Sequence, residues 1–368
     1  MASRPGAFSS TLRAQPEKCR VLVVDDSAVA RLVVQRIINE TDRFAVAGQA
    51  ASAQEAFDKL DSIAVDLIIL DIEMPGMDGI EAIPHLLRRS GDAPILVVSS
   101  HCREDAEASV QAMAMGASDI ILKPENRGLT ERFAKSLKNK MIRLTDPDAA
   151  AKEAHVEISD PEPLHLAPKP AEGHPVRCLA IGASTGGIHA LSTFFAALPR
   201  DLDMPIFVTQ HLPPDFIVYF ARQLKLITGR DTFPARDGQR VKAGEVLVAP
   251  GDAHLTVRDT DGYVRIVFSD ERTPGGFRPS VDPMLSSVAR VYGADAVGVV
   301  LTGMGRDGAD GAKELADAGG ELLVQDRASS VIWGMPGAVA AQNIANLIAP
   351  PPELAAYVDE RARTFGWR

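Results

Sequence analysis

Short, nearly continuous apolar runs alternate with amphipathic helical segments along this chain, and no other feature limits its fold as strongly. In the first part of the chain these runs cover residues 19–26, 44–50, 65–71, 94–100 and 119–124. Strands that are apolar on both faces are typical of a parallel sheet covered by helices on both sides. We therefore expect a doubly wound α/β domain with a five-stranded parallel sheet.

The second half of the chain repeats this style without repeating the sequence. Its apolar runs cover residues 176–181, 205–210, 245–249, 254–258, 263–268, 296–302 and 320–325. Most gaps accommodate a helix, but between 245 and 270 they shrink to short turns containing PGD and TDG, which indicates consecutive hairpins. The pattern predicts a second α/β domain with a mostly parallel sheet and an antiparallel hairpin at its edge.

A proline- and acid-rich stretch separates the two halves. Residues 145–175 show no sustained apolar period, which is typical of an extended, solvated linker. The predicted division of the chain is a disordered tail (1–17), a first domain (18–140), a linker (141–175) and a second domain (176–368).

Charge and hydropathy argue against two classes of partner. The net charge is −10 and no basic stripe stands out, which argues against nucleic-acid binding. No apolar run approaches the ~18 residues of a membrane helix, and the first residues lack the apolar core of a secretory signal. We therefore expect a cytoplasmic protein with no direct membrane insertion.

Acidic residues end two strands of the first predicted sheet. Asp25 and Asp26 follow one strand and Asp71 ends another, while Ser99 and Lys123 follow two more at the same edge. Carboxylates gathered there repel one another unless a hard cation such as Mg²⁺ joins them, and a lysine and a hydroxyl nearby suit a phosphoryl group. Helix capping is the alternative role for such acids.

In the second half, residues 182–186 read GASTG, the G-x-S-x-G pattern of a nucleophile held on a strained turn. The pattern follows an apolar run and precedes a helical segment, so Ser184 is expected near a helix N-terminus, where free N–H groups stabilise an oxyanion. Capping that helix is the structural alternative for the same serine. The stretch does not match the usual phosphate-binding loops.

A nucleophilic serine needs a histidine base. His211 directly follows a predicted strand, as Ser184 does, and is the better candidate; His254, which opens a hairpin strand, is the runner-up. His189 lies five residues beyond Ser184 on one helix, so its side chain points away from the serine.

The base in turn needs an acid to orient it. Asp307 lies in a glycine-rich loop after another strongly apolar run, and Asp310 is also available there, although a loop aspartate is usually a turn former. The chain order Ser…His…Asp differs from that of α/β-hydrolases, so the serine pattern does not imply that fold.

The motifs VVDDS, LDIEMPGMDG, VVSS and ILKP, in this order, make residues 18–140 resemble the flavodoxin-like receiver domain of two-component response regulators. The resemblance implies that Asp71 is the phospho-acceptor, that Ser99 is the switch hydroxyl and that Lys123 contacts the phosphate. The implied Mg²⁺ ligands are Asp25, Asp26, Asp71 and the backbone carbonyl of Glu73. Ile120 stands where the family often has an aromatic residue, so an aromatic switch is not expected.

The motifs IGASTGG, QHLPPDF, APGDAHL, RPSVDPML, VLTGMGRDG and WGMPGAV make residues 176–350 resemble the catalytic domain of chemotaxis protein-glutamate methylesterases, the CheB family. The resemblance implies that Ser184 is the nucleophile, His211 the general base and Asp307 the orienting acid. Backbone N–H groups at Thr185 and Met304 are the candidate oxyanion donors. TPGGF stands before RPSVD, where the family varies.

The combined resemblance implies a phosphorylation-activated hydrolase. Its substrate is a glutamate γ-methyl ester on a chemoreceptor helical bundle, with deamidation of receptor glutamine as a further activity and a chemotaxis histidine kinase as phosphodonor. A monomer is expected, with Mg²⁺ in the receiver, no cofactor in the catalytic domain, and a resting receiver that covers the active site. Two alternatives stay open: a protein-binding output domain that uses GASTGG as a packing turn, and a hydrolase acting on another protein.

Overall fold

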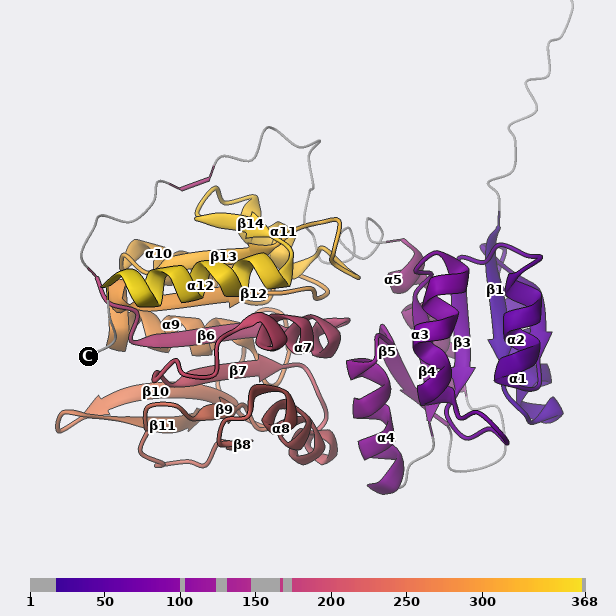
Figure 1. Cartoon of the computed structure of the whole chain (residues 1–368), viewed down its shortest axis with the longest axis horizontal. Helices are drawn as coiled ribbons and strands as arrows, with labels where there is room; N and C mark the ends of the chain where they lie inside the picture. The colour runs from indigo at the N-terminus through magenta and orange to yellow at the C-terminus, as the bar shows by residue number, and fades with distance from the viewer. Residues whose placement is uncertain (1–17, 100–102, 124–130, 147–165, 168–173, 366–368) are drawn as a thin grey trace, which may run out of the picture.

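The computed structural model describes residues 18–99, 103–123, 131–146, 166–167 and 174–365 (Figure 1). The predicted tail and most of the predicted linker lie outside these residues. The described residues form two α/β units, each built around its own parallel sheet. The predicted fold class, two doubly wound domains, is therefore confirmed.

The first unit has five strands in the order β2-β1-β3-β4-β5, all of them parallel. Its strands are β1 (Cys19–Val24), β2 (Phe44–Ala50), β3 (Leu67–Asp71), β4 (Ile95–Ser99) and β5 (Asp119–Leu122). Its helices are α1 (Ala28–Asn39), α2 (Ala53–Leu60), α3 (Gly79–Ser90), α4 (Arg103–Ala114) and α5 (Glu131–Thr145). The strand order reverses between β1 and β3, which places the crevice of the sheet beside the ends of these two strands.

Local capping chemistry explains where several of these helices begin. The side chains of Ser27, Ser52 and Asp78 accept hydrogen bonds from the first turns of α1, α2 and α3. Each satisfies a backbone N–H that has no partner within its helix. Helix α3 ends at Gly91, whose positive φ of 67° suits a residue without a Cβ.

The second unit has seven strands in the order β14-β13-β12-β6-β7-β9-β8, and every neighbouring pair is parallel. These strands are β6 (Cys178–Ala183), β7 (Ile206–Gln210), β8 (Thr232–Pro234), β9 (Val246–Val248), β12 (Ala296–Val300), β13 (Glu321–Gln325) and β14 (Leu347–Ala349). The helices are α7 (Gly187–Ala197), α8 (Pro214–Thr228), α9 (Val281–Tyr292), α10 (Ala309–Asp317), α11 (Met335–Ala340) and α12 (Pro351–Phe365), with a short 3₁₀ helix η1 (Gly293–Asp295). Here the strand order reverses between β6 and β12, which places the crevice between these strands.

A two-stranded antiparallel sheet stands apart from the main sheet. It consists of β10 (His254–Thr260) and β11 (Tyr263–Ser269), and it packs against α9. The turn residues Asp261 and Gly262 both have positive φ, the geometry that a two-residue hairpin favours.

The prediction of consecutive hairpins is half wrong. Strand β9 does not fold back on β10 but inserts between β7 and β8 in parallel. All three β9 residues are buried, so both of its faces are covered, and the PGD turn packs at Gly251 against the backbone of Pro214. The three-residue strands β8 and β14 were not predicted, because runs this short carry no periodicity.

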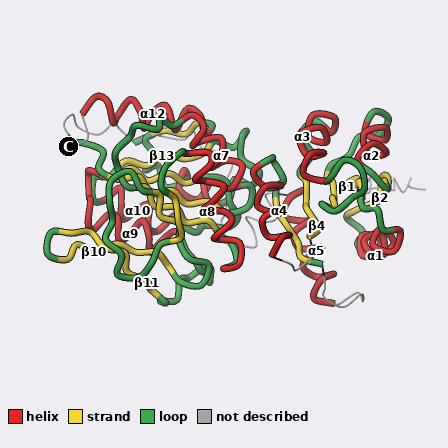
Figure 2. The backbone as a smooth tube through the Cα atoms, turned by 60° about the horizontal axis from the view of Figure 1, so that its bottom comes forward, coloured by secondary structure: helices red, strands yellow, loops and turns green. Residues whose placement is uncertain are grey.

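The two units share a buried apolar contact. Helix α4 of the first unit packs against α7 and α8 of the second, and Figure 2 shows the three helices side by side. Val110 and Met113 on α4 belong to the same buried cluster as Phe216 and Phe220 on α8. Within the part of the chain described here, no helix is both long and apolar enough to cross a membrane.

Candidate functional site

Three polar side chains meet at the crevice of the second sheet. Ser184 follows β6, His211 follows β7, and Asp307 lies in the loop after β12. The three strands are neighbours in the order β12-β6-β7, so their carboxyl ends deliver the three residues to one edge.

The three side chains form one hydrogen-bonded row. The Ser184 Oγ lies 3.0 Å from the His211 Nδ1, and the His211 Nε2 lies 2.7 Å from the Asp307 Oδ2. Because a carboxylate only accepts, Nε2 carries a hydrogen, which leaves the lone pair of Nδ1 to accept from the serine hydroxyl. This is the arrangement that a serine nucleophile with a histidine base requires.

The first turn of α9 surrounds the Asp307 carboxylate with donors. The Ser280 Oγ donates to Oδ1 at 2.5 Å, and the backbone N–H of Val281 donates to Oδ2 at 2.8 Å. Burial by itself would raise the pKa of Asp307, but the hydrogen bonds from His211, Ser280 and Val281 hold that pKa below its usual range. Asp307 is therefore an anion at neutral pH, and a carboxylate in this position would stabilise a positive charge on the His211 ring.

A second carboxyl group lies behind the first. Asp282 accepts a hydrogen bond from the backbone N–H of Gly311 at 2.9 Å and is also hydrogen-bonded to Asp307. Burial and the negative charge of Asp307 raise the pKa of Asp282 to about 7. Because neighbouring carboxylates disfavour each other's ionisation, the pKa of Asp282 is raised while the donors around Asp307 hold its pKa down.

The turn that carries Ser184 leaves no room for side chains at two positions. Gly186 has a φ of +76°, and a Cβ there would lie 2.6 Å from the Val331 side chain. A Cβ on Gly187 would lie 2.3 Å from the Gln210 Oε1. The left-handed residue of the turn is Gly186 and not Ser184, so the strained serine that the G-x-S-x-G pattern predicts is not present.

Backbone groups beside the serine are available for an oxyanion. Counting only the described residues, the N–H groups of Thr185 and Met304 donate no hydrogen bond, whereas Gly186 donates to the Ser118 carbonyl of the first unit at 2.9 Å. Donors left unpaired beside a nucleophile are what an oxyanion hole needs. The assignment of Thr185 and Met304 stays a prediction.

The row opens into a cleft of about 760 Å³ between the two units. Phe277 lies on one wall and stacks on the His211 ring, with centroids 4.5 Å apart and planes inclined by 13°. The opposite wall belongs to the first unit and includes Lys123, Phe133 and Arg143. The first unit therefore faces Ser184 across the cleft.

The remaining sequence candidates lie elsewhere. His254 is buried and bonds to the backbone at Ser280 and Glu271, so it is not the base. Asp310 is exposed and pairs with Arg306. His189 is exposed, and its Nδ1 donates to the Ala114 carbonyl of α4 across the interface.

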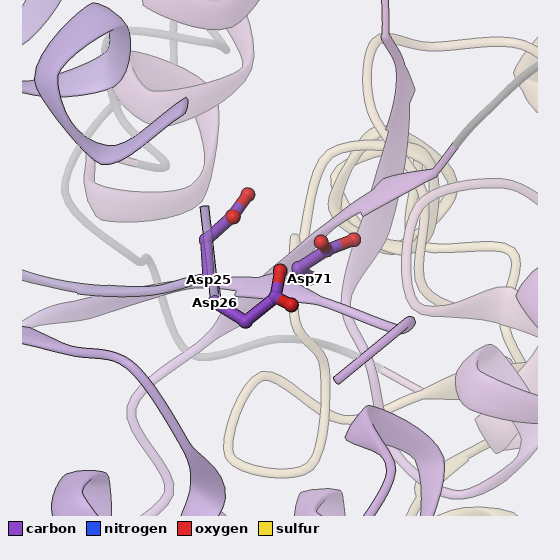
Figure 3. Close-up of side chains that lie close together, drawn as sticks. All are labelled: Asp25, Asp26 and Asp71. Carbon is purple, nitrogen blue, oxygen red and sulfur yellow. The ribbon is translucent and has the colours of Figure 1, made fainter. Parts of the chain in front are cut away.

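Three carboxylates gather at the edge of the first sheet. Oxygen atoms of Asp25, Asp26 and Asp71 lie within 4.8 Å of one another, and Figure 3 shows the three side chains together. Burial and the neighbouring charge of Asp71 raise the pKa of Asp25, and burial raises the pKa of Asp71. An excess of buried negative charge built from oxygen ligands fits Mg²⁺, which would offset it.

The other predicted residues of the first unit lie at the same edge. The Lys123 Nζ donates to the Asp71 Oδ2 at 2.8 Å. Although burial opposes the ammonium form, the hydrogen bond from Lys123 to Asp71 and the charge of that carboxylate raise the pKa of Lys123. The backbone of Glu73 hydrogen-bonds to Asp71, while the role of its carbonyl as a metal ligand stays a prediction. Ser99 accepts a hydrogen bond from the buried Ser109 on α4 at 2.9 Å.

Comparison with known proteins identifies both units. A model of the response regulator receiver domain matches residues 21–133, and a model of CheB methylesterase matches residues 179–358. A protein-glutamate methylesterase/protein-glutamine glutaminase 2 of Caulobacter vibrioides is 39% identical over 348 residues, which cover 94% of this chain and 99% of the relative. The chain belongs to the CheB methylesterase family.

Two further similarities were found for this CheB-family chain. A protein-glutamate methylesterase/protein-glutamine glutaminase 1 of Rhodospirillum rubrum is 38% identical and covers 92% of this chain and 94% of its own. The crystal structure of the Thermotoga maritima CheB methylesterase catalytic domain is 33% identical with a TM-score of 0.49, and covers 52% of this chain and 99% of its own.

Sequence reasoning missed several contacts around the row in this CheB-family chain. Ser280 and Asp282 lie in the quoted RPSVDPML motif, but no role was predicted for either residue, and their contacts with Asp307 were missed. Ser280 occupies the N-cap position of α9, yet its side chain makes no cap hydrogen bond because it donates to Asp307 instead. The stacking of Phe277 on His211 has no signal in the sequence, since it joins residues 66 positions apart.

Proposed function

We propose that the chain hydrolyses glutamate γ-methyl esters on chemoreceptors, with Ser184 as nucleophile, His211 as general base and Asp307 as orienting acid. The hydrogen-bonded row from Ser184 through His211 to Asp307 carries the proposal. A protein-binding output domain has no need for a serine hydroxyl aligned with a buried histidine and carboxylate. The proposed catalytic domain covers residues 176–368 and the proposed receiver residues 18–140.

Acyl transfer is the first step. The Ser184 Oγ bonds to the ester carbonyl carbon while its proton moves to the His211 Nδ1, and this base contributes about 10²–10⁴-fold. His211 then gives that proton to the methoxy oxygen, the bond from carbon to this oxygen breaks, and methanol leaves. Unpaired N–H groups at Thr185 and Met304 hold the carbonyl oxygen as it becomes negative, at about 10²–10³-fold for one donor.

Hydrolysis of the acyl-enzyme completes the reaction. A water oxygen attacks the acyl carbon, His211 takes a water proton, and the same proton returns to the Ser184 Oγ as the carboxylic acid leaves. The Asp307 carboxylate stabilises the imidazolium from the Nε2 side throughout. Phe277 covers one face of the ring, where the electron-rich face of an aromatic ring also stabilises a cation.

Deamidation of receptor glutamine is the second candidate activity. It uses the same row, with ammonia in place of methanol as the leaving group. The names of both relatives described above include protein-glutamine glutaminase, and this favours the activity here.

Control by phosphorylation is part of the proposal. A chemotaxis histidine kinase supplies the phosphoryl group to Asp71, with Asp25, Asp26, Asp71 and the Glu73 carbonyl holding Mg²⁺ and Lys123 pairing with the phosphate. When bound, Mg²⁺ neutralises charge on the transferring group. The cleft wall formed by the receiver and the bond from Gly186 to Ser118 support a resting form in which the receiver restricts access to Ser184.

Methanol release from methylated receptor membranes tests the proposal. Ser184→Ala is expected to reduce release by ~10³-fold or more, because only binding and the oxyanion donors remain. Ser192→Ala is the matched control, since this hydroxyl bonds only to the Ile188 carbonyl of the same helix. Activity that survives Ser184→Ala would exclude the serine mechanism.

A small phosphodonor with Mg²⁺ tests the control. Wild type is expected to respond, whereas Asp71→Asn is not. Asp58→Asn, a change on the exposed part of α2, is expected to respond like wild type. An equal response in Asp71→Asn would refute Asp71 as the phospho-acceptor.

A further inference from the structure

We infer that His254 is a positioning residue of the hydrolase site: its two ring nitrogens tie together the ends of the loop that places Phe277 and Ser280 against the catalytic row. The inference rests on the proposed function, because it assigns His254 an effect on the reactivity of Ser184. His254 itself lies outside hydrogen-bonding contact with the catalytic serine and acts through other residues.

Both ring nitrogens of His254 have backbone partners of opposite kind. The residue is 1% exposed at the start of β10. Its Nε2 lies 2.9 Å from the Glu271 carbonyl oxygen, and its Nδ1 lies 2.9 Å from the backbone nitrogen of Ser280. A carbonyl only accepts and a backbone N–H only donates, so the ring is a neutral imidazole with its hydrogen on Nε2.

These partners stand at the two ends of one loop. Strand β11 ends at Ser269 and helix α9 begins at Val281, so residues 270–280 connect them. Most of this loop is exposed, and apolar packing alone does not hold it. The ring of His254 bridges the carbonyl at the beginning of the loop and the N–H at its end, and this removes much of the freedom of the loop.

The bridged loop supplies two contacts to the catalytic row. Phe277 lies in the loop and stacks on the His211 ring at 4.5 Å. Ser280 ends the loop, and its Oγ donates to the Asp307 Oδ1 at 2.5 Å. The buried His254 thus fixes Phe277, which stacks on the ring of the base, and Ser280, which donates to the orienting acid. From the sequence, His254 was considered only as an alternative base.

Two amide substitutions separate the roles of the ring nitrogens. In His254→Asn the shorter side chain places its amide near the position of Nδ1, where its oxygen accepts from the Ser280 N–H. In His254→Gln the longer side chain places its amide near Nε2, where its N–H donates to the Glu271 carbonyl. The Asn variant keeps the link toward Asp307, and the Gln variant loses it.

The measurement is the rate at which a fluorophosphonate probe labels Ser184 in the full-length protein, together with kcat and KM for methanol release. His254→Gln is expected to lower the labelling rate and kcat by about 10- to 100-fold with little change in KM, because small misplacements of catalytic groups cost rates of this order. His254→Asn is expected to stay within about threefold of wild type. His85→Asn on α3 of the receiver is the control and is expected to label like wild type.

Melting temperatures of all variants distinguish positioning from packing. Equal labelling in the Asn and Gln variants, or rates that follow only their melting temperatures, would overturn the role of His254 while leaving the proposed hydrolase intact. Folded wild type that the probe does not label would instead overturn the serine mechanism of the proposed function. The two failures are therefore distinguishable.

Discussion

The raised pKa of Asp282 beside Asp307 leads to a prediction about how stability depends on pH. Asp282 has a pKa raised from 3.8 to about 7, because of burial first and then the charge of Asp307. Asp282→Asn replaces it by a neutral group of the same shape. The asparagine oxygen accepts from the Gly311 N–H, and its amide donates to the Asp307 carboxylate, so both contacts persist without a proton.

The direction in which the free energy of unfolding changes with pH follows from the number of protons that the folded and unfolded states bind. Between pH ~4 and about 7 the folded wild type holds a proton on Asp282 that the unfolded chain has lost, so the free energy of unfolding decreases as the pH rises. Each pH unit is worth about 1.4 kcal/mol, and about three units give an upper limit of about 4 kcal/mol. Since Asp282 is not fully buried, screening reduces this to about 2–4 kcal/mol. Asp282→Asn has no such proton to lose, so its free energy of unfolding does not fall in this way. Its stability relative to wild type therefore increases from pH ~4 to about 7 and is constant above that pH.

Urea unfolding followed by tryptophan fluorescence measures the effect. Trp333 lies in the second unit, where its Nε1 donates to the Gln325 carbonyl of β13, so its fluorescence reports on the unit that contains Asp282. Asp317→Asn is the matched control, because it removes one acid from an exposed position at the end of α10, where Asp317 pairs with Lys313 and does not contribute to the raised pKa of Asp282. If the free energies of unfolding of wild type and Asp282→Asn change in parallel from pH 5 to pH 8, the raised pKa of Asp282 is refuted.

Two further substitutions test the site and its control. Gly303→Ala would place a Cβ 2.9 Å from the Ser184 Cβ and 2.3 Å from the Met335 Sδ, so methanol release is expected to fall by about 10²-fold, and unchanged release would contradict the close packing. Ser109→Ala removes the hydrogen bond from α4 to Ser99, which is worth about 1 kcal/mol. Because α4 packs against the catalytic unit, this change is expected to raise methanol release in the absence of phosphodonor by about fivefold. Basal release equal to that of wild type would show that this bond does not couple the two units.

The ends of the apolar runs could be predicted from the sequence, and most of the candidate site residues lie at these ends. Asp71, Ser184 and His211 lie at or directly after strands whose apolar character is a local property of the sequence. Carboxyl ends of neighbouring parallel strands meet at one edge, so the class of fold was enough to bring Ser184 and His211 to one edge of the second sheet and Asp71 to the corresponding edge of the first.

The choice between two histidines depended on strand pairing. His211 and His254 both adjoin apolar runs, but β7 lies beside β6 in the main sheet, whereas β10 pairs with β11 in a separate one. Strand pairing joins residues that are far apart in the chain. The apolar run next to His211 or His254 therefore does not by itself indicate which strand pairs with it.

The sequence by itself determined the two α/β units and the residues that can do chemistry at their edges, because hydrophobic periodicity and turn residues act over a few positions. Only the tertiary structure decided what surrounds those residues: the bridge by His254, the ring of Phe277 over His211, the raised pKa of Asp282 and the receiver wall of the cleft. Each of these depends on burial and on contacts between distant segments. These properties exist only once the chain is packed.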